Sequence, residues 1–310
     1  MTLAILCSGQ GGQRAAMFAL TDAAPESEAL FTHAAELLGG IDPRELVHGA
    51  SAEILHQNRT AQILCVLQSL AAVSTLREVI PSELIVAGYS VGEISAWAVA
   101  GAISMPAALD LVAARAEQMT AASSAGDGLI FVHGLDRPVI EALCIRYSTQ
   151  IAIAEPDAAF VIGGRRSALD AVGHEARGLH ARVIDLPVQV AAHTSYLRTA
   201  ASAFRQTLSQ APMHMPAATM RLLSGIDGNA VIDLKTGLDK LAAQLAQTVQ
   251  WGECLRSCVE AGATAFFELG PGHALADMAA RAHPQVPARS LDDFRSLSGA
   301  RTWLVAHTRG

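Results

Sequence analysis

The residues that most clearly suggest chemistry are a serine and its flanking glycines at positions 88–92, which read GYSVG. This spacing matches the G-x-S-x-G pattern, in which a sharp strand-to-helix turn lifts the serine hydroxyl above a sheet. Residues 84–89 are apolar and strand-like, and residues 91–100 are rich in alanine. A helix N-terminus there would favour negative charge that develops during a reaction. The pattern predicts Ser90 as a nucleophile, and the alternative is a serine that only caps the helix.

A neutral serine needs a base, and histidine is the most frequent one. The chain contains 11 histidines, so their presence alone does not decide which one acts. His193 stands out because it lies in PVQVAAHTSY, at an abrupt change from a predicted strand to a predicted helix. We therefore expect His193 to be the base and most of the others to have surface or structural roles.

A third candidate is Arg115, which lies in the largely apolar helical stretch LDLVAARAEQM. A buried guanidinium needs a carboxylate partner. It can hold one in a bidentate fork that lysine cannot copy. The carboxylate of a substrate would fit, but an ion pair with Glu93 or Asp110, or a surface arginine with its head group in water, is the structural alternative.

Alternating strands and helices must position these side chains. Strands are predicted over 3–8, 84–89 and 265–269, and a glycine loop follows the first strand. Helices are predicted over 25–38, 60–79, 91–100, 105–122, 194–209 and 238–261. This alternation is typical of an α/β fold with a largely parallel, doubly wound sheet.

The pattern changes between residues 127 and 191. The order there is strand, helix, two strands joined at Pro156–Asp157, helix and strand, which is the ferredoxin-like βαββαβ pattern. We therefore expect a large domain formed by residues 1–126 and 192–310, with a ferredoxin-like small subdomain, 127–191, inserted into it.

Composition excludes several classes of protein. The net charge is −7, and Lys235 and Lys240 are the only lysines, so no basic stripe indicates a nucleic-acid partner. No apolar stretch is long enough to span a membrane, and the N-terminus lacks a basic signal-peptide region. The five cysteines lack regular spacing, and we expect Cys254 and Cys258 to lie in the core rather than on a metal. These features predict a cytoplasmic protein with reduced thiols and no metal.

Six motifs in register carry a resemblance. They are GQGGQ at 9–13, GYSVGE at 88–93, LVAARAEQM at 111–119, AAHT at 191–194, VQW at 249–251 and FELGPG at 267–272. The chain resembles the malonyl-CoA:acyl-carrier-protein acyltransferase family over almost its whole length. The resemblance implies an α/β-hydrolase-like domain with a ferredoxin-like insert, in agreement with the independent prediction above.

The resemblance also implies roles for the catalytic residues. Ser90 would take the malonyl group from coenzyme A, and His193 would be its base. The family orients this histidine with a main-chain carbonyl, which we assign to Gln250. The oxyanion hole would use backbone N–H groups of Val91 and Gln10.

The resemblance further implies how the substrate is bound. Arg115 would bind the malonyl carboxylate, and Gln62 would line the acyl pocket unless it is simply on a helix surface. Met119 would shape the cavity, as would Val91. No tightly bound cofactor is implied, because the coenzyme A thioester is the substrate. The acceptor would be an acyl carrier protein, with a docking patch around Arg165, Arg166 and Arg198 unless these are ordinary surface residues.

Three positions depart from the family pattern. Tyr89 replaces the usual histidine before the nucleophile, Ser8 replaces a proline in the first loop, and Ala191–Ala192 match neither common extender-specificity pattern. The GYSVGE motif in a stand-alone chain is similar to the malonate decarboxylase epsilon subunit, which we prefer as the branch. The alternative is a malonyl transacylase of fatty-acid or polyketide synthesis.

Two other functional classes remain open. A serine hydrolase such as a thioesterase would share the serine turn, although its usual HGGG-type oxyanion loop is not found in this sequence. An inactive docking subunit would keep the fold and lose the site, which the presence of Ser90, His193 and Arg115 disfavours.

Overall fold

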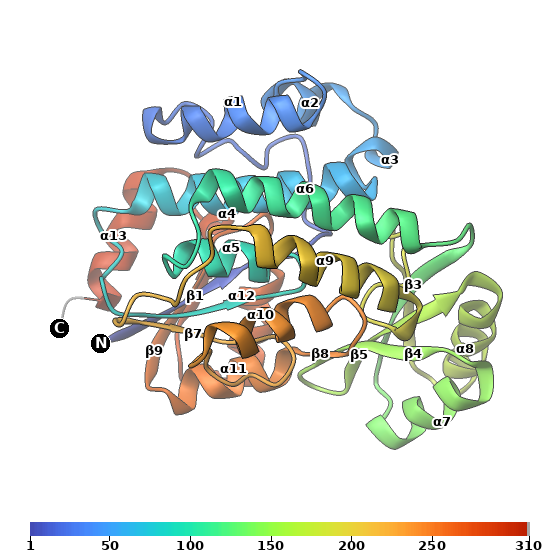
Figure 1. Cartoon of the computed structure of the whole chain (residues 1–310). Helices are drawn as coiled ribbons and strands as arrows, with labels where there is room; N and C mark the ends of the chain where they lie inside the picture. The colour runs from blue at the N-terminus through green and yellow to red at the C-terminus, as the bar shows by residue number, and fades with distance from the viewer. Residues whose placement is uncertain (309–310) are drawn as a thin grey trace.

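The structure is a computed structural model that describes residues 1–308, and it contains two five-stranded sheets (Figure 1). In the larger sheet the strand order is β10-β9-β1-β2-β7, and every neighbouring pair is parallel. The strands are β1 (Thr2–Cys7), β2 (Leu84–Gly88), β7 (Met220–Leu222), β9 (Ala263–Glu268) and β10 (Ala288–Ser290). The chain therefore has the α/β fold with a parallel sheet that the sequence predicts.

Helices cover the larger sheet, which is why its central strands are apolar along their whole length. Helix α4 packs against α5 and α6, while α9 packs between α6 and α10. Figure 1 shows α1 and α2 as an outer layer above α4 and α6. The bounds are α1 (Glu28–Leu37), α2 (Pro43–Gly49), α3 (Ala52–Leu55), α4 (Asn58–Leu76), α5 (Gly92–Val99), α6 (Met105–Ala122), α9 (Arg198–Gln210), α10 (Leu234–Ala243), α11 (Trp251–Glu260), α12 (Ala274–Ala282) and α13 (Leu297–Thr308).

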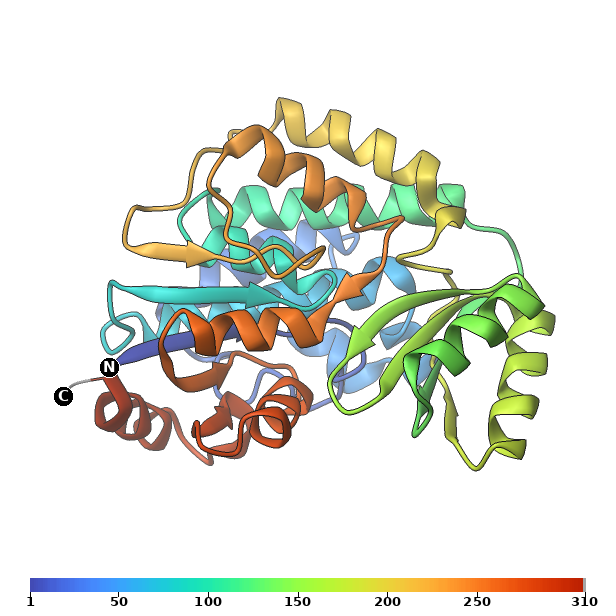
Figure 2. The same ribbon diagram turned by 90° about the horizontal axis from the view of Figure 1, so that it is seen from below.

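The second sheet forms a smaller lobe beside the first, as the view from below shows (Figure 2). Its strand order is β6-β3-β5-β4-β8. The elements are β3 (Asp127–His133), α7 (Arg137–Tyr147), β4 (Gln150–Glu155), β5 (Ala159–Arg165), α8 (Arg166–Gly178), β6 (Arg182–Asp185) and β8 (Val249–Gln250). Strand β8 comes from much later in the chain and pairs with β4 in parallel, so it ties the lobe to the larger domain.

Alternation along β3 divides the small sheet into two faces. Ile130 and Val132 face the small core beneath α7 and α8. Leu129 and Phe131 belong to the larger core and line a cavity between the two sheets. The small sheet therefore forms one wall of that cavity.

The predicted single helix over 238–261 is wrong. Helix α10 ends at Ala243, α11 begins at Trp251, and the intervening segment contributes β8. Val249 pairs with Ile153 of β4, so strand pairing with a distant segment overrides the local helical pattern. The helix predicted over 105–122 has those limits in the structure, whereas α2, α3, α12, α13, β7 and β10 were not predicted.

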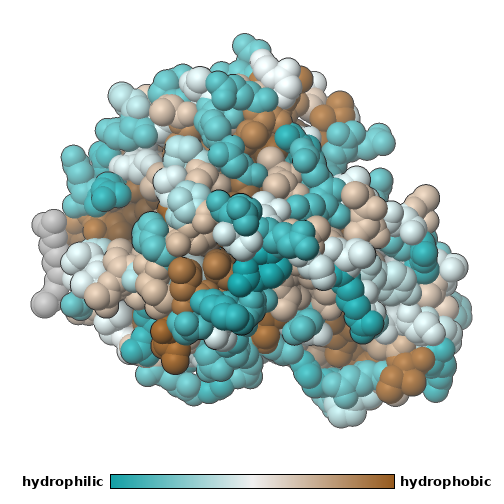
Figure 3. Space-filling view, in the orientation of Figure 1, coloured by the Kyte–Doolittle hydropathy of each residue, from teal (hydrophilic) through white to brown (hydrophobic). Residues whose placement is uncertain are grey.

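Figure 3 shows a mostly hydrophilic face with separate hydrophobic patches and a notch beside the smaller lobe. The most exposed large apolar side chains, Ile145 and Ile232, are scattered rather than gathered. None of the helices in residues 1–308 combines the length and hydropathy needed to cross a membrane. All five cysteines are buried, so the prediction that Cys254 and Cys258 lie in the core is confirmed.

Candidate active site

Ser90 lies at the sharp turn between β2 and α5 and has a φ of 55°. This left-handed conformation is strained for a serine and is typical of residues held for function. The flanking glycines are sterically required. A Cβ at Gly88 would collide with the backbone of Glu93, and one at Gly92 would collide with the carbonyl of Cys7. The turn therefore fits tightly between β1 and α5.

His193 lies beside Ser90, as predicted. Its Nε2 is 2.6 Å from the Ser90 Oγ, and its Nδ1 is 2.6 Å from the backbone carbonyl oxygen of Gln244. A carbonyl can only accept, so Nδ1 carries the proton and Nε2 is left to accept from the serine hydroxyl. Burial lowers the pKa of His193 to about 3, with a further contribution from the charge of Arg115. The imidazole is therefore neutral at pH 7 and available as a base.

The assignment of the orienting carbonyl to Gln250 is wrong. That carbonyl belongs to Gln244, just after α10, and the next residue, Leu245, accepts the His193 backbone N–H at 2.9 Å. Gln250 lies in β8, and its side chain accepts a hydrogen bond from Arg137 at 3.2 Å. Every residue has a backbone carbonyl, so no side-chain property identifies the one that orients His193. Only the end of α10 at Ala243, which the sequence did not predict, places the Gln244 carbonyl at the histidine.

Glu93 helps to hold Gln244 in place, although it makes no hydrogen bond with His193 itself. Its Oε2 accepts hydrogen bonds from the Gly225 N–H, at 3.0 Å, and from the side-chain amide of Gln244. The side chain is 1% exposed, and burial raises its pKa to about 7. From the sequence, Glu93 was a candidate only as an ion-pair partner for Arg115. The structure shows that Glu93 accepts a hydrogen bond from Gln244, whose backbone carbonyl orients His193.

Arg115 is 1% exposed, and its guanidinium has one protein partner among the described residues. One nitrogen donates to the Gln62 side-chain oxygen at 2.5 Å, and the Nη2 atom is buried without a hydrogen-bond acceptor. Gln62 is fixed in turn by donating to Asn58, at 2.7 Å, and to the Met119 sulfur, at 3.5 Å. An unpaired buried guanidinium nitrogen is costly, and a substrate carboxylate would relieve that cost.

The structural alternatives for Arg115 are not observed within residues 1–308. Asp110 contacts His33 instead, at 2.8 Å, and Glu93 makes no ion pair with the guanidinium. Gln62 is fully buried, which excludes the helix-surface alternative for this glutamine. The structure thus brings Arg115, Gln62 and Met119 into one buried cluster, close enough to His193 for the arginine charge to affect its pKa.

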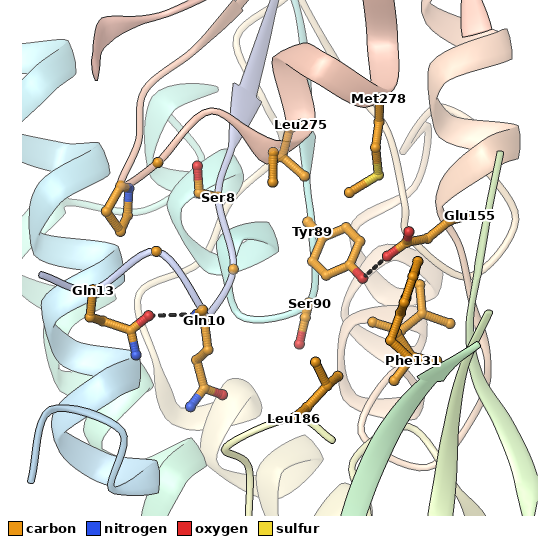
Figure 4. Close-up of a pocket in the computed structure, with 18 of the residues that line it drawn as sticks. Ser8, Gln10, Gln13, Tyr89, Ser90, Phe131, Glu155, Leu186, Leu275 and Met278 are labelled. Atoms are coloured by element: carbon orange, nitrogen blue, oxygen red, sulfur yellow. Dashed lines mark hydrogen bonds between the residues drawn. The ribbon is translucent and has the colours of Figure 1, made fainter. Parts of the chain in front are cut away.

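A cavity of about 780 Å³ opens beside Ser90 and His193 (Figure 4). It lies between the glycine loop after β1, the small sheet and the start of α12. Gln10 lines it, in a loop where Gly11 has a φ of 125° and donates its N–H to the Gln13 side chain at 2.5 Å. The backbone N–H groups of Gln10 and Val91 have no acceptor among the described residues. Neither N–H group is therefore used by the protein itself, as an oxyanion hole requires.

The serine that departs from the family pattern has a structural partner. Ser8 donates to Glu268 Oε1 at 2.7 Å, and the N–H of Ala276 donates to Oε2 at 2.8 Å. The contact joins the first loop to the C-terminal end of β9 and to α12. Ser8 therefore fixes the glycine loop from which Gln10 projects.

Comparison with known proteins defines the class. A family model for the acyl transferase domain matches residues 5–293, and the chain belongs to that family. The malonyl CoA-acyl carrier protein transacylase of Mycobacterium bovis is 33% identical over 298 residues, covering 93% of this chain and 96% of the relative. The enzyme of the same name from a Synechocystis strain is 28% identical and covers 96% of this chain and all of the relative. The resemblance to malonyl transacylases is confirmed.

Solved structures agree. MCAT from Mycobacterium tuberculosis superposes with a TM-score of 0.89 at 30% identity, covering 98% of this chain and all of that one. A malonyl-transacylase solved in complex with a type II PKS acyl-carrier protein gives a TM-score of 0.89 at 26% identity, covering 97% of this chain and 99% of that one.

Proposed function

We propose that this chain transfers a malonyl group from malonyl-CoA to the phosphopantetheine thiol of an acyl carrier protein, through an acyl-enzyme on Ser90. The observation that carries the proposal is the buried, half-paired guanidinium of Arg115 close to a Ser90–His193 pair. Acyl transfer needs the pair, and selection of a dicarboxylic acyl group needs a fixed cation. The names of the relatives and of the solved structures support the same reaction.

In the first half of the reaction, Ser90 Oγ attacks the thioester carbonyl while His193 Nε2 takes the hydroxyl proton. The carbon–sulfur bond then breaks, the proton passes from His193 to the departing thiolate, and the malonyl ester stays on Ser90. The N–H groups of Val91 and Gln10 hold the oxyanion formed between these steps. In the second half the carrier thiol gives its proton to His193 and reverses the sequence.

Substrate choice depends on the buried cluster. Arg115 would bind the free malonyl carboxylate, oriented by Gln62, while Met119 shapes the pocket around the acyl group. An acetyl group has no carboxylate to fill this position. No tightly bound cofactor takes part, since the coenzyme A thioester is itself the substrate.

The comparisons also bear on which carrier protein accepts the malonyl group. They favour a malonyl transacylase of fatty-acid or polyketide synthesis over the malonate decarboxylase epsilon subunit. The relatives and structures are named as malonyl-CoA acyl carrier protein transacylases, and one was solved with a polyketide carrier. We therefore propose a carrier of fatty-acid or polyketide synthesis rather than of malonate decarboxylase. Of the proposed docking arginines, Arg165 pairs with Asp127 at 3.1 Å and Arg166 with Asp185 at 2.8 Å, which leaves Arg198 the stronger candidate.

Each region of the chain has its own part in the proposed reaction. The α/β-hydrolase-like domain, residues 1–126 and 192–310, supplies the nucleophile, the base and Arg115. The ferredoxin-like subdomain, residues 127–191, supplies the second wall of the cavity. A cytoplasmic location, where coenzyme A thioesters are available, belongs to the same proposal.

Intact-protein mass after brief mixing with malonyl-CoA tests this function, with acetyl-CoA and a Ser90→Ala variant run alongside. We expect a malonyl adduct on the wild type with malonyl-CoA alone, and no adduct on the variant. Steady release of coenzyme A without an adduct would instead indicate a thioesterase. Neither adduct nor release would indicate a docking subunit.

A further inference from the structure

Tyr89, which replaces the family histidine, makes a contact that joins the two sheets beside the nucleophile. Its hydroxyl donates to Glu155 Oε1 at 2.5 Å (Figure 4). Tyr89 follows the last residue of β2 and immediately precedes Ser90, whereas Glu155 ends β4 of the small sheet. The Tyr89 ring also packs edge-on against Trp251, with ring centroids 5.4 Å apart. The phenol is therefore held in one orientation, and it holds the carboxylate.

Glu155 differs from the other carboxylates that line the 780 Å³ cavity. Glu268 accepts from Ser8 and from a backbone N–H, and Asp292 pairs with Arg14 at 2.9 Å. Asp277 contacts His273 at 2.7 Å. Within residues 1–308, Glu155 has no ion-pair partner, and its Oε2 has no hydrogen-bond donor. Glu155 is half-buried and lines the cavity, and one of its carboxylate oxygens is an unused acceptor.

The surroundings of this acceptor are apolar. Phe131, Leu275 and Met278 lie around the Tyr89–Glu155 pair in Figure 4, and further aliphatic side chains of the small sheet line the same wall. An amide N–H that leaves water for such a wall loses a hydrogen bond unless the protein replaces it. Burial raises the pKa of Glu155 above its ordinary value, so the carboxylate itself gains from a donor.

We propose that Glu155, oriented by Tyr89, accepts a hydrogen bond from an amide N–H of the thiol arm that carries the acyl group. This inference rests on the proposed function, because coenzyme A and an acyl carrier protein share the same amide-containing arm. One acceptor would then serve both halves of the transfer. Glu155 lines the same cavity as Ser90 and His193, whereas Arg115, which would bind the other end of the malonyl group, is not among the lining residues of that cavity.

A pair of small thioester donors tests the inference. S-malonyl-N-acetylcysteamine keeps an amide N–H close to the sulfur, and the matching oxygen ester, S-malonyl-2-acetoxyethanethiol, replaces that N–H with an oxygen that cannot donate. We expect wild-type acylation of Ser90 to favour the amide donor by about tenfold or more in kcat/KM, as a hydrogen bond to a charged acceptor allows. Glu155→Ala should abolish the preference by slowing only the amide donor.

Three further variants sharpen the result. Glu155→Gln keeps an acceptor oxygen without the charge and should retain a preference of a few-fold. Tyr89→Phe frees the carboxylate and should weaken the preference without abolishing it. Asp157→Asn removes a nearby carboxylate that faces Arg281 at 3.8 Å outside the cavity, and should leave the preference unchanged.

Equal slowing of both donors in Glu155→Ala would overturn the inference, because it would mean that the Tyr89–Glu155 contact only joins the sheets. An unchanged preference in that variant would overturn it too. In both cases wild-type acylation by malonyl-CoA would leave the proposed function standing. Failure of the wild type to form any malonyl adduct would overturn the proposed function and this inference with it.

Discussion

The two halves of the catalytic pair are held in opposite ways. Ser90 is positioned by its immediate neighbours, because the glycines at 88 and 92 allow a turn that no larger residue could make. His193 is positioned by chain that is distant in sequence: the carbonyl groups of Gln244 and Leu245 fix its ring and its backbone. The comparison shows that one reacting group depends on local backbone geometry and the other on tertiary packing.

The largest expected effect comes from removing the distant half of the pair. His193→Ala should slow acylation of Ser90 by about 10²–10⁴-fold, because the serine hydroxyl loses its base at 2.6 Å. Stopped-flow or quenched mass measurements with malonyl-CoA would show it. Added imidazole should restore part of the rate in the variant and have no effect on the wild type. Near-normal acylation without imidazole would place the base elsewhere.

Loss of the carboxylate-binding cation should produce a smaller and more selective effect. Arg115→Ala should reduce malonyl transfer by about a hundredfold, the scale of a buried charge-assisted pair. Transfer from acetyl-CoA should fall far less, so relative tolerance for acetyl rises. Arg115→Lys, which keeps the charge and loses the fork, should lie between them. An equal fall for malonyl and acetyl would show that Arg115 acts on folding or on His193 rather than on substrate choice.

The effect of Glu93, which supports the carbonyl that orients His193, can be separated from that of Gln250, to which this carbonyl was assigned from the sequence. Glu93→Ala should lower kcat by about tenfold with little change in KM, since Gly225 and Gln244 lose their shared acceptor and the carbonyl at 244 shifts. Gln244→Ala keeps the carbonyl and should cost less. Gln250→Ala is the matched control and should stay within about twofold of the wild type, as expected for a surface contact. A larger effect at 250 than at 93 would reverse the assignment.

The smallest expected effect is on stability as a function of pH. Burial lowers the pKa of His193 from 6.5 to about 3 in the folded protein, so the unfolded chain binds more protons between these two pH values. The contribution of neutral His193 is therefore complete above pH 6.5 and is lost as the pH falls toward 3. The difference in Tm between the wild type and His193→Gln, followed from pH 7 to pH 4, isolates the contribution of His193 to stability. We expect the wild type to lose more Tm on acidification, and parallel curves would contradict it.

Part of the fold was accessible from sequence because its signals are local. The helix over 105–122 has a serine cap, a proline in its first turn and continuous helical periodicity, and the structure reproduces it. The helix over 238–261 had the same apparent continuity, yet it breaks to let Val249 pair with β4. Nothing within that segment signals the partner strand, which lies nearly a hundred residues earlier. The wrong assignment of the orienting carbonyl to Gln250 followed from the failure to predict this break in the helix.

The sequence by itself determined the serine turn, its flanking glycines and the identities of the histidine and the arginine, because each depends on side-chain type within a short stretch of chain. Only the tertiary structure decided which carbonyl orients His193, since every residue carries one and position alone selects it. It also decided that Tyr89 meets Glu155, because Tyr89 follows β2 of the larger sheet and Glu155 ends β4 of the smaller one. The same packing buries Arg115 with one nitrogen unpaired, a state that depends on what surrounds the guanidinium and not on its neighbours in the chain.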